Sequence, residues 1–147
     1  MGYRKLFMKL RFVDHLHRKQ CDDIVKKAEL FYRQLPVLDV LSELGSASQK
    51  EVADRLHISP PAITNTVKRL TKHGYVEWEV SENDRRLHRL ALTEKGRKEH
   101  LICFGKLNQM DHEVLDGIDP EDLKVFEKVL DQMIEKLHSL EKGEQND

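Results

Sequence analysis

The sequence is short of the residues on which several classes of protein depend. Its 147 residues include two cysteines, seven glycines and four prolines. Cys21 and Cys103 form no spaced framework, which argues against a secreted disulfide scaffold and favours a reducing, cytoplasmic location. The few glycines and prolines, together with abundant Leu, Lys and Glu, favour a mainly helical chain over a disordered one.

Long apolar runs are also missing. No stretch approaches the roughly 18 apolar residues that a bilayer span needs, so we expect no membrane partner. Residues 1–19 lack the uncharged core and the small-residue cleavage site of a signal peptide.

Motifs for catalysis are equally scarce. An enzyme needs a nucleophile–base pair, paired carboxylates or a glycine loop that cradles a phosphate. The glycines are scattered and form neither GxGxxG nor GxxxxGKS/T. We therefore predict that the chain is not an enzyme and holds no cofactor.

Charge is balanced overall, with 25 basic and 26 acidic residues, but it is uneven along the chain. Residues 59–97 carry 8 basic and 5 acidic side chains, and residues 98–147 carry 6 and 13. A basic middle segment favours polyanion binding there. Solvated helix faces explain the same difference about as well, so charge alone does not decide the function.

Long helical patterns lie at both ends of the chain. A first helix is predicted, with a break before Pro36, from residues that share one face: Leu6, Leu10, Val13, Ile24, Ala28 and Phe31. The last helix begins with Asp119 as its cap and Pro120 in its first turn. Its apolar residues follow a heptad spacing: Leu123, Phe126, Leu130, Met133, Leu137 and Leu140. The partner of this seam is either a second copy of the chain or the protein's own first helix.

Two further helices are predicted between these ends. One runs from Glu94 to Asp116, with Thr93 as its cap and Gly117 as its stop. Its apolar positions are Leu101, Phe104, Leu107, Met110, Val114 and Leu115. The other is short, has Pro36 in its first turn and closes at Gly45.

The middle of the chain predicts a helix-turn-helix. Ser48 and Glu51 form a capping box that starts a helix of about nine residues. His57 and Ile58 make a tight turn, and Ser59 caps the next helix. The buried stripe of that second helix is Ile63, Val67 and Leu70, and His73-Gly74 ends it. Two short helices joined by such a turn form a helix-turn-helix.

The side of the second helix that faces away from Ile63 suits DNA. It has no acid and no large apolar residue, and it carries Pro61, Asn65, Lys68, Arg69 and Lys72, flanked by Ala62 and Thr64. An amide pairs bidentately with adenine, and cations suit guanine or phosphate. We predict DNA contact here, against the plainer alternative of a solvated face. The runner-up function, a winged helix that binds protein, would usually expose Leu, Phe or Tyr there.

A β-hairpin is predicted after the helix-turn-helix. The alternating segments Tyr75–Val80 and His88–Leu92 flank the turn-forming residues 81–86. The tip presents Arg85 and Arg86 to a flanking minor groove or to phosphates. Asp84 is placed to pair with Arg86 and preset the tip, or else it forms an ordinary surface ion pair. A helix-turn-helix followed by a hairpin is a winged helix.

These segments together resemble the MarR family of transcriptional regulators. The resemblance covers Leu30 to Gly96 and is carried by LFYRQLPVLDVLSELG, SQKEVADRLHISPPAITNTVKRLTKHGYVE and NDRRLHRLALTEKG. The last segment matches the family's wing motif at Asp84, Arg86, Leu92-Thr93 and Gly96. The resemblance implies a mainly α fold with a small β-hairpin wing. A winged helix-turn-helix domain (34–97) would join an N-terminal dimerisation helix region (1–33) to C-terminal dimerisation helices (98–147).

The resemblance also implies a function. It is that of a homodimer that binds double-stranded DNA at a pseudo-palindromic operator and represses until a small-molecule effector binds. The implied DNA-binding residues are Ser59, Pro61, Ala62, Thr64, Asn65, Lys68, Arg69, Asp84, Arg85 and Arg86. The implied dimerisation residues are Leu6, Leu10, Val13, Leu123, Phe126, Leu130, Met133 and Leu137.

Two sensing chemistries are weaker alternatives. Some relatives sense oxidants through a cysteine in the first helix, but Cys21 lies closer to Gln34 than that cysteine does. The acids next to Cys21 also disfavour a thiolate, so a structural thiol is the favoured interpretation. Histidines raise a zinc-sensor alternative without forming a close ligand cluster, and we expect no metal: His15, His17, His100 with Cys103, and His112.

Overall fold

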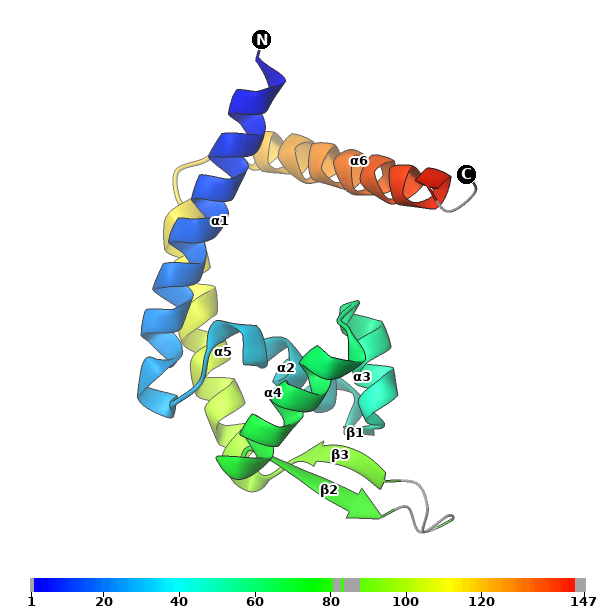
Figure 1. The fold of residues 1–147 in the computed structure, drawn as a ribbon. Helices are drawn as coiled ribbons and strands as arrows, with labels where there is room; N and C mark the ends of the chain where they lie inside the picture. The colour runs from blue at the N-terminus through cyan, green and yellow to red at the C-terminus, as the bar shows by residue number, and fades with distance from the viewer. Residues whose placement is uncertain (1, 81–82, 84–87, 145–147) are drawn as a thin grey trace. The chain divides into compact units, whose positions relative to one another are not determined.

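The computed structural model describes residues 2–80, 83 and 88–144. Contacts divide the chain into two compact units, residues 1–109 and residues 110–147. The first unit holds the winged helix together with the N-terminal helix, and the second holds the end of one long helix and the whole of the last (Figure 1). The fold is mainly helical with a small antiparallel sheet, as predicted.

The N-terminal helix is shorter than its apolar pattern suggests. Helix α1 spans Tyr3–Val25 and is followed by the 3₁₀ turns η1 (Lys26–Ala28) and η2 (Tyr32–Gln34). The chain does break before Pro36, as predicted, but the break comes at the end of α1, so placing Ala28 and Phe31 on the face of this helix is wrong. Glu29 takes a left-handed conformation with φ of +55°, and the amide of Tyr32 donates to Asp22 Oδ1 at 2.9 Å, which folds the chain back on α1.

Three short helices form the body of the winged helix: α2 (Leu35–Leu44), α3 (Gln49–Leu56) and α4 (Pro60–Lys72). Pro36 lies in the first turn of α2, as predicted. Gly45 ends that helix with φ of +76°, a conformation that glycine adopts without steric cost. Fully buried side chains from these helices build the core: Val37, Leu38, Leu41, Val52, Ile63 and Leu70.

The sheet closes this core from one side. Within the described residues it is antiparallel in the order β1 (Ser46–Ala47), β3 (His88–Leu92), β2 (Val76–Val80). The predicted hairpin is confirmed by the register, which pairs Val76 with Leu92 and Val80 with His88. Strand β1 was not predicted, because two residues are too few to show an alternating pattern.

Helix α5 spans Glu94–Leu115 and begins, as predicted, at Thr93, whose hydroxyl oxygen accepts a hydrogen bond from the amide of Gly96 at 3.0 Å. Its predicted apolar residues mark its buried face only in part, since Leu107 is buried but Leu101 is 71% exposed and Phe104 47%. The other buried positions are Gly96, His100 and Cys103. His100 is accommodated because its Nε2 lies 2.5 Å from Asp39 Oδ1 on α2.

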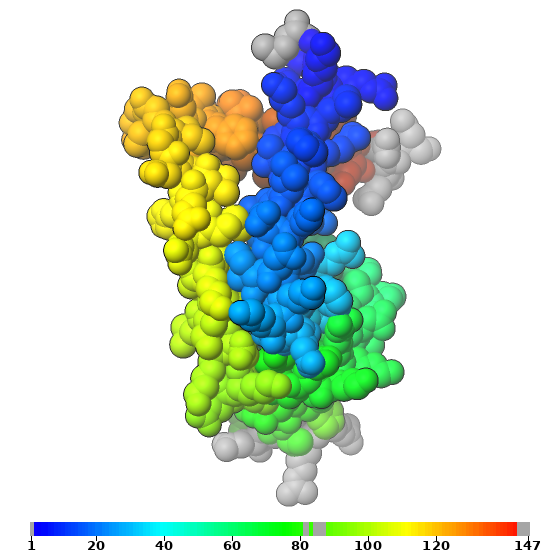
Figure 2. Space-filling model, turned by 90° about the vertical axis from the view of Figure 1, so that its left-hand side faces the viewer, coloured from blue at the N-terminus to red at the C-terminus, as the bar shows by residue number. Residues whose placement is uncertain are grey.

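In both views the C-terminal end of α1 lies beside α5 (Figures 1 and 2). Cys21 and Val25, at the end of α1, are fully buried in the first unit. This end of α1 is therefore fixed to the winged helix, whereas most of the residues from Tyr3 to Leu16 are exposed.

Helix α6 (Pro120–Glu144) makes up most of the second unit. Asp119 Oδ1 accepts a hydrogen bond from the amide of Glu121 at 2.8 Å, which confirms the predicted cap. The predicted heptad residues lie along its length with Phe126 50% and Leu137 52% exposed. None of the helices in the described part of the chain is long and apolar enough to cross a membrane.

Candidate nucleic-acid interface

Capping residues fix the turn between α3 and α4. Ser48 Oγ accepts a hydrogen bond from the amide of Glu51, and Glu51 Oε2 accepts one from the amide of Ser48 at 2.8 Å. His57 turns the chain with φ of +53°, and Ser59 Oγ accepts from the amide of Ala62 at 3.3 Å. The predicted helix-turn-helix is confirmed, with the local hydrogen bonds that its sequence requires.

A polar bridge links the two helices on their outer side. Gln49 Nε2 donates to Thr64 Oγ1 at 2.7 Å, and Thr64 Oγ1 donates to the carbonyl of Pro60 at 2.8 Å. Because the hydroxyl proton of Thr64 is used inside the protein, Thr64 offers an external partner only its methyl group and one lone pair.

Helix α4 has one buried and one exposed side. Ile63, Val67 and Leu70 are at most 3% exposed, as predicted. The predicted DNA-binding residues of this helix and its cap are all exposed: Ser59, Pro61, Ala62, Thr64, Asn65, Lys68 and Arg69. Lys72 is exposed as well, and α4 contains no acid. The fold therefore presents a polar, cationic side of α4 to the outside.

Arg69, like Thr64, already has a partner within the protein. Its guanidinium carbon lies 4.2 Å from the centroid of the Phe31 ring. Phe31 precedes η2, and its amide donates to Gln34 Oε1 at 3.0 Å, so a buried glutamine holds the segment that carries the ring. The cation of Arg69 is thus placed over an aromatic face.

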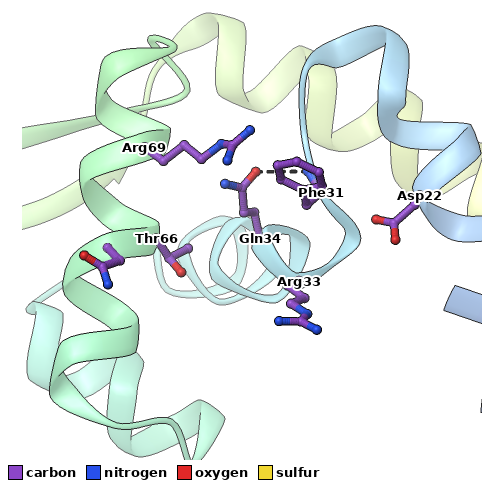
Figure 3. A pocket seen from close by; sticks show the side chains of 7 residues that line it. Asp22, Phe31, Arg33, Gln34, Thr66 and Arg69 are labelled. Atoms are coloured by element: carbon purple, nitrogen blue, oxygen red, sulfur yellow. Dashed lines mark hydrogen bonds between the residues drawn. The ribbon is translucent and has the colours of Figure 1, made fainter. Parts of the chain in front are cut away.

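A pocket lies between α4 and the segment that follows α1 (Figure 3). Its volume is about 470 Å³, and two cations, one acid, one aromatic ring and three neutral polar groups line it. The lining residues are Asp22, Phe31, Arg33, Gln34, Asn65, Thr66 and Arg69. In Figure 3 the side chains of Arg69 and Gln34 point toward Phe31. This pocket was not predicted from the sequence, because Phe31 was placed on a helical face and Asn65 and Arg69 were assigned to DNA contact alone.

One strand of the wing is tied to the helix-turn-helix through Arg89. Its Nε donates to Ser46 Oγ at 3.1 Å, and its terminal nitrogen donates to the carbonyl of Ser46 and to Glu51 Oε2. Glu51 therefore takes part both in the capping box of α3 and in the contact with Arg89 of the wing. The predicted tip residues Asp84, Arg85 and Arg86 lie outside the described residues.

The two cysteines are buried. Cys21 Sγ lies 3.7 Å from the ring nitrogens of His17. Burial, with the nearby charge of Glu99, raises the pKa of the Cys103 thiol above its usual 9.0, which favours the unreactive thiol form. In the described part of the chain no group of three or more His, Cys, Asp and Glu side chains is arranged to hold a metal ion.

Comparison with known proteins agrees with this geometry. A family model described as the MarR family matches residues 32–87. The chain is 28% identical to the transcriptional regulator YwoH of Bacillus subtilis, over 84% of this chain and 89% of that one. It is 26% identical to the regulator ZitR of Lactococcus lactis, over 86% and 89%. These relatives are regulators of transcription, not enzymes.

Solved structures share the fold. A MarR-like transcription regulator from Bacillus cereus has a TM-score of 0.78 at 26% identity, covering 93% of this chain and 99% of its own. FabT of Streptococcus pneumoniae, solved in complex with DNA, has a TM-score of 0.82 at 22% identity, covering 95% and 99%. The ordered helices, the wing and these similarities agree: residues 32–87 match the MarR family, and the chain as a whole is similar to MarR-family winged helix-turn-helix transcriptional regulators.

Proposed function

We propose that the protein binds double-stranded DNA in a sequence-specific way, as a homodimer on a pseudo-palindromic operator, and represses transcription until a small molecule binds. The proposed DNA contacts come from α4 and its cap, and from the wing tip. They are made by Ser59, Pro61, Ala62, Thr64, Asn65, Lys68, Arg69, Asp84, Arg85 and Arg86.

The exposed side of α4 is the observation that carries this proposal. Its cations suit the phosphates and guanines of a duplex, and the Asn65 amide suits adenine. A helix that docks onto protein would expose large apolar anchors, and no exposed residue of α4 is one. FabT, which has a similar fold, was solved in complex with DNA, and this supports DNA binding as the function.

Exposed apolar faces on α1 and α6 support a homodimer. Leu6 and Val13 on α1 are 45% and 62% exposed, and α6 exposes Phe126 and Leu137. A long helix with an uncovered apolar stripe is poorly stable in water, so a partner helix is required. The proposed dimer interface is formed by Leu6, Leu10, Val13, Leu123, Phe126, Leu130, Met133 and Leu137. It lies in residues 1–33 and 98–147, on either side of a DNA-binding domain formed by residues 34–97.

The pocket beside α4 supports an effector site. Asn65 and Arg69 line it and also belong to the proposed DNA-binding side. A molecule bound there would contact the recognition helix itself. It would weaken DNA binding if its affinity for the DNA-free arrangement of that helix is higher.

Selection from fragmented bacterial DNA tests the DNA-binding proposal. Purified protein should retain a small set of fragments that share an inverted repeat, with half-sites about 10 base pairs apart. Asn65→Ala should relax the preference at one position in each half-site. Retention of random fragments by the native chain, or of none, would contradict sequence-specific binding.

A further inference from the structure

The polar bridge between α3 and α4 limits what Thr64 can offer to a partner. Gln49 Nε2 donates to Thr64 Oγ1 at 2.7 Å, and Thr64 Oγ1 donates to the carbonyl of Pro60 at 2.8 Å. Both bonds join the hydroxyl to the protein, so it has no proton left for an external acceptor. The groups that remain are the methyl group and one lone pair of the oxygen.

The same two bonds fix the orientation of the Thr64 side chain. A threonine in a helix divides between two χ1 rotamers, because its hydroxyl can bond a carbonyl three or four residues earlier. Thr64 makes this bond to Pro60, and Gln49 holds the same oxygen from the neighbouring helix. The oxygen and the methyl group occupy different staggered positions on Cβ, so fixing the oxygen also fixes the methyl group.

Thr64 lies in the part of α4 that suits contact with bases. It is exposed and belongs to the N-terminal half of the helix. In a helix-turn-helix the N-terminal residues of the second helix contact base edges in the major groove. A fixed methyl group at this place is suited to recognising an apolar feature of a base.

We propose that the Thr64 methyl group recognises the C5-methyl group of a thymine, and that Gln49 is the positioning residue for this contact. In the major groove only thymine presents a methyl group. The free lone pair of Thr64 would accept from the amine of adenine or of cytosine, which distinguishes bases less well. Gln49 is not among the DNA contacts proposed above and acts through Thr64. This inference rests on the proposed function.

Replacement of thymine by deoxyuridine tests the contact, because uracil pairs in the same way as thymine and lacks only the methyl group. The probe is a fragment that the native protein retains in the selection from bacterial DNA, with the thymines of one half-site replaced one at a time. Fluorescence anisotropy gives the affinity for each duplex. At one thymine the replacement should weaken binding about fourfold, the effect of removing one buried methyl group.

Variants assign this effect to its residues. Thr64→Ser removes the methyl group and keeps the hydroxyl, so it should bind the thymine and deoxyuridine duplexes equally at that position. Gln49→Met keeps the length of the side chain but cannot donate, so the ratio of the two affinities should fall from about fourfold toward one.

Thr71→Ser is the matched control. The Thr71 hydroxyl also donates to the carbonyl four residues earlier, that of Val67, at 2.7 Å, but Thr71 lies near the other end of α4. This variant should keep the native ratio. Each ratio compares two duplexes bound by the same variant, so a loss of folded protein does not change it.

The outcomes separate this inference from the proposed function. An unchanged ratio in Thr64→Ser overturns the thymine contact, because another residue then touches the methyl group. An unchanged ratio in Gln49→Met overturns the positioning role. Sequence-specific binding without any thymine that is sensitive to deoxyuridine overturns the inference and leaves the DNA-binding function intact. If the native chain retains no fragment, or only random ones, the proposed function itself is contradicted.

Discussion

The guanidinium of Arg69 stacks on the ring of Phe31, with 4.2 Å from its central carbon to the ring centroid. One residue of the proposed recognition helix is therefore held by the segment that follows α1. Lys68, the preceding residue, is exposed and has the same charge. The two neighbours should contribute differently to DNA binding.

We expect Lys68→Ala to weaken duplex binding more than Arg69→Ala does. A lysine that reaches a phosphate contributes about one unit to the dependence of log affinity on log salt, so Lys68→Ala should reduce that slope by about one. Arg69 gives up a cation–π contact worth about 0.5–1 kcal/mol before it reaches DNA, which reduces its net contribution. Fluorescence anisotropy over a series of salt concentrations measures both quantities. If Arg69→Ala reduced the affinity and the salt dependence more than Lys68→Ala did, this prediction would be wrong.

Gly96 should be essential for stability because α5 approaches Tyr75 closely there. A Cβ at Gly96 would lie 2.0 Å from the carbonyl oxygen of Tyr75, and backbone must move to accommodate it. We expect Gly96→Ala to lower the free energy of unfolding by about 3 kcal/mol or more. Gly105→Ala is the matched control on the same helix, since nothing lies within 4 Å of its added Cβ. It should stabilise the protein by about 0.5–1 kcal/mol in urea denaturation. Equal stability of the two variants would refute the close approach.

The parts of the fold that sequence predicted well are those fixed by local rules. The capping box at Ser48, the cap at Ser59 and the stripe through Ile63 depend on residues within one or two turns, and all three were predicted. The strand pairing of Val76 with Leu92 followed from alternation on either side of a turn-rich segment.

The predictions failed where residues far apart in the sequence determine whether a side chain is buried. On α5 the buried positions include His100, because Asp39 on another helix provides its hydrogen bond. No apolar pattern within α5 encodes that partner. Phe31 lies outside the predicted helix because Gln34 and Asp22 accept hydrogen bonds from the amides of Phe31 and Tyr32. The pocket that Phe31 lines with Arg69 is formed by segments that are far apart in the sequence, so no local pattern predicts it.

The free energy of unfolding should decrease at alkaline pH because two buried groups, the phenol of Tyr75 and the thiol of Cys103, must then lose a proton. Burial raises the pKa of Tyr75 above its usual 10.0, with further contributions from the charges of Glu99 and Glu29. Burial and Glu99 likewise raise the pKa of Cys103 above 9.0. The unfolded chain ionises first, so the stabilisation is complete below pH 9 and is lost as the pH rises through the folded-state pKa values.

Urea denaturation at neutral pH and at a series of values above pH 9 measures this loss. Cys103→Ala removes one of the two groups and should make the alkaline fall in unfolding free energy shallower. Tyr75→Phe should also make this fall shallower. In addition, it should lower the unfolding free energy by the same amount at every pH below the pKa of Tyr75, because it removes the hydrogen bond that Tyr75 donates to the carbonyl of Ala28. A profile with the same slope for the native chain and both variants would contradict the assignment.

A single charge on α6 should separate the proposed homodimer. Leu137 is 52% exposed and belongs to the heptad seam, so in a two-fold dimer each interface would contain it twice. Leu137→Lys would bury two ammonium groups without partners, at a cost of several kcal/mol, and sedimentation should then show monomer at concentrations where the native chain is dimeric.

Gln132→Lys adds the same charge to an exposed position of the same helix, away from the seam, and should leave the dimer intact. Because paired half-sites need paired recognition helices, Leu137→Lys should also lose affinity for an inverted repeat but keep weak binding to one half-site. Unchanged sedimentation of Leu137→Lys would place the interface elsewhere on the chain.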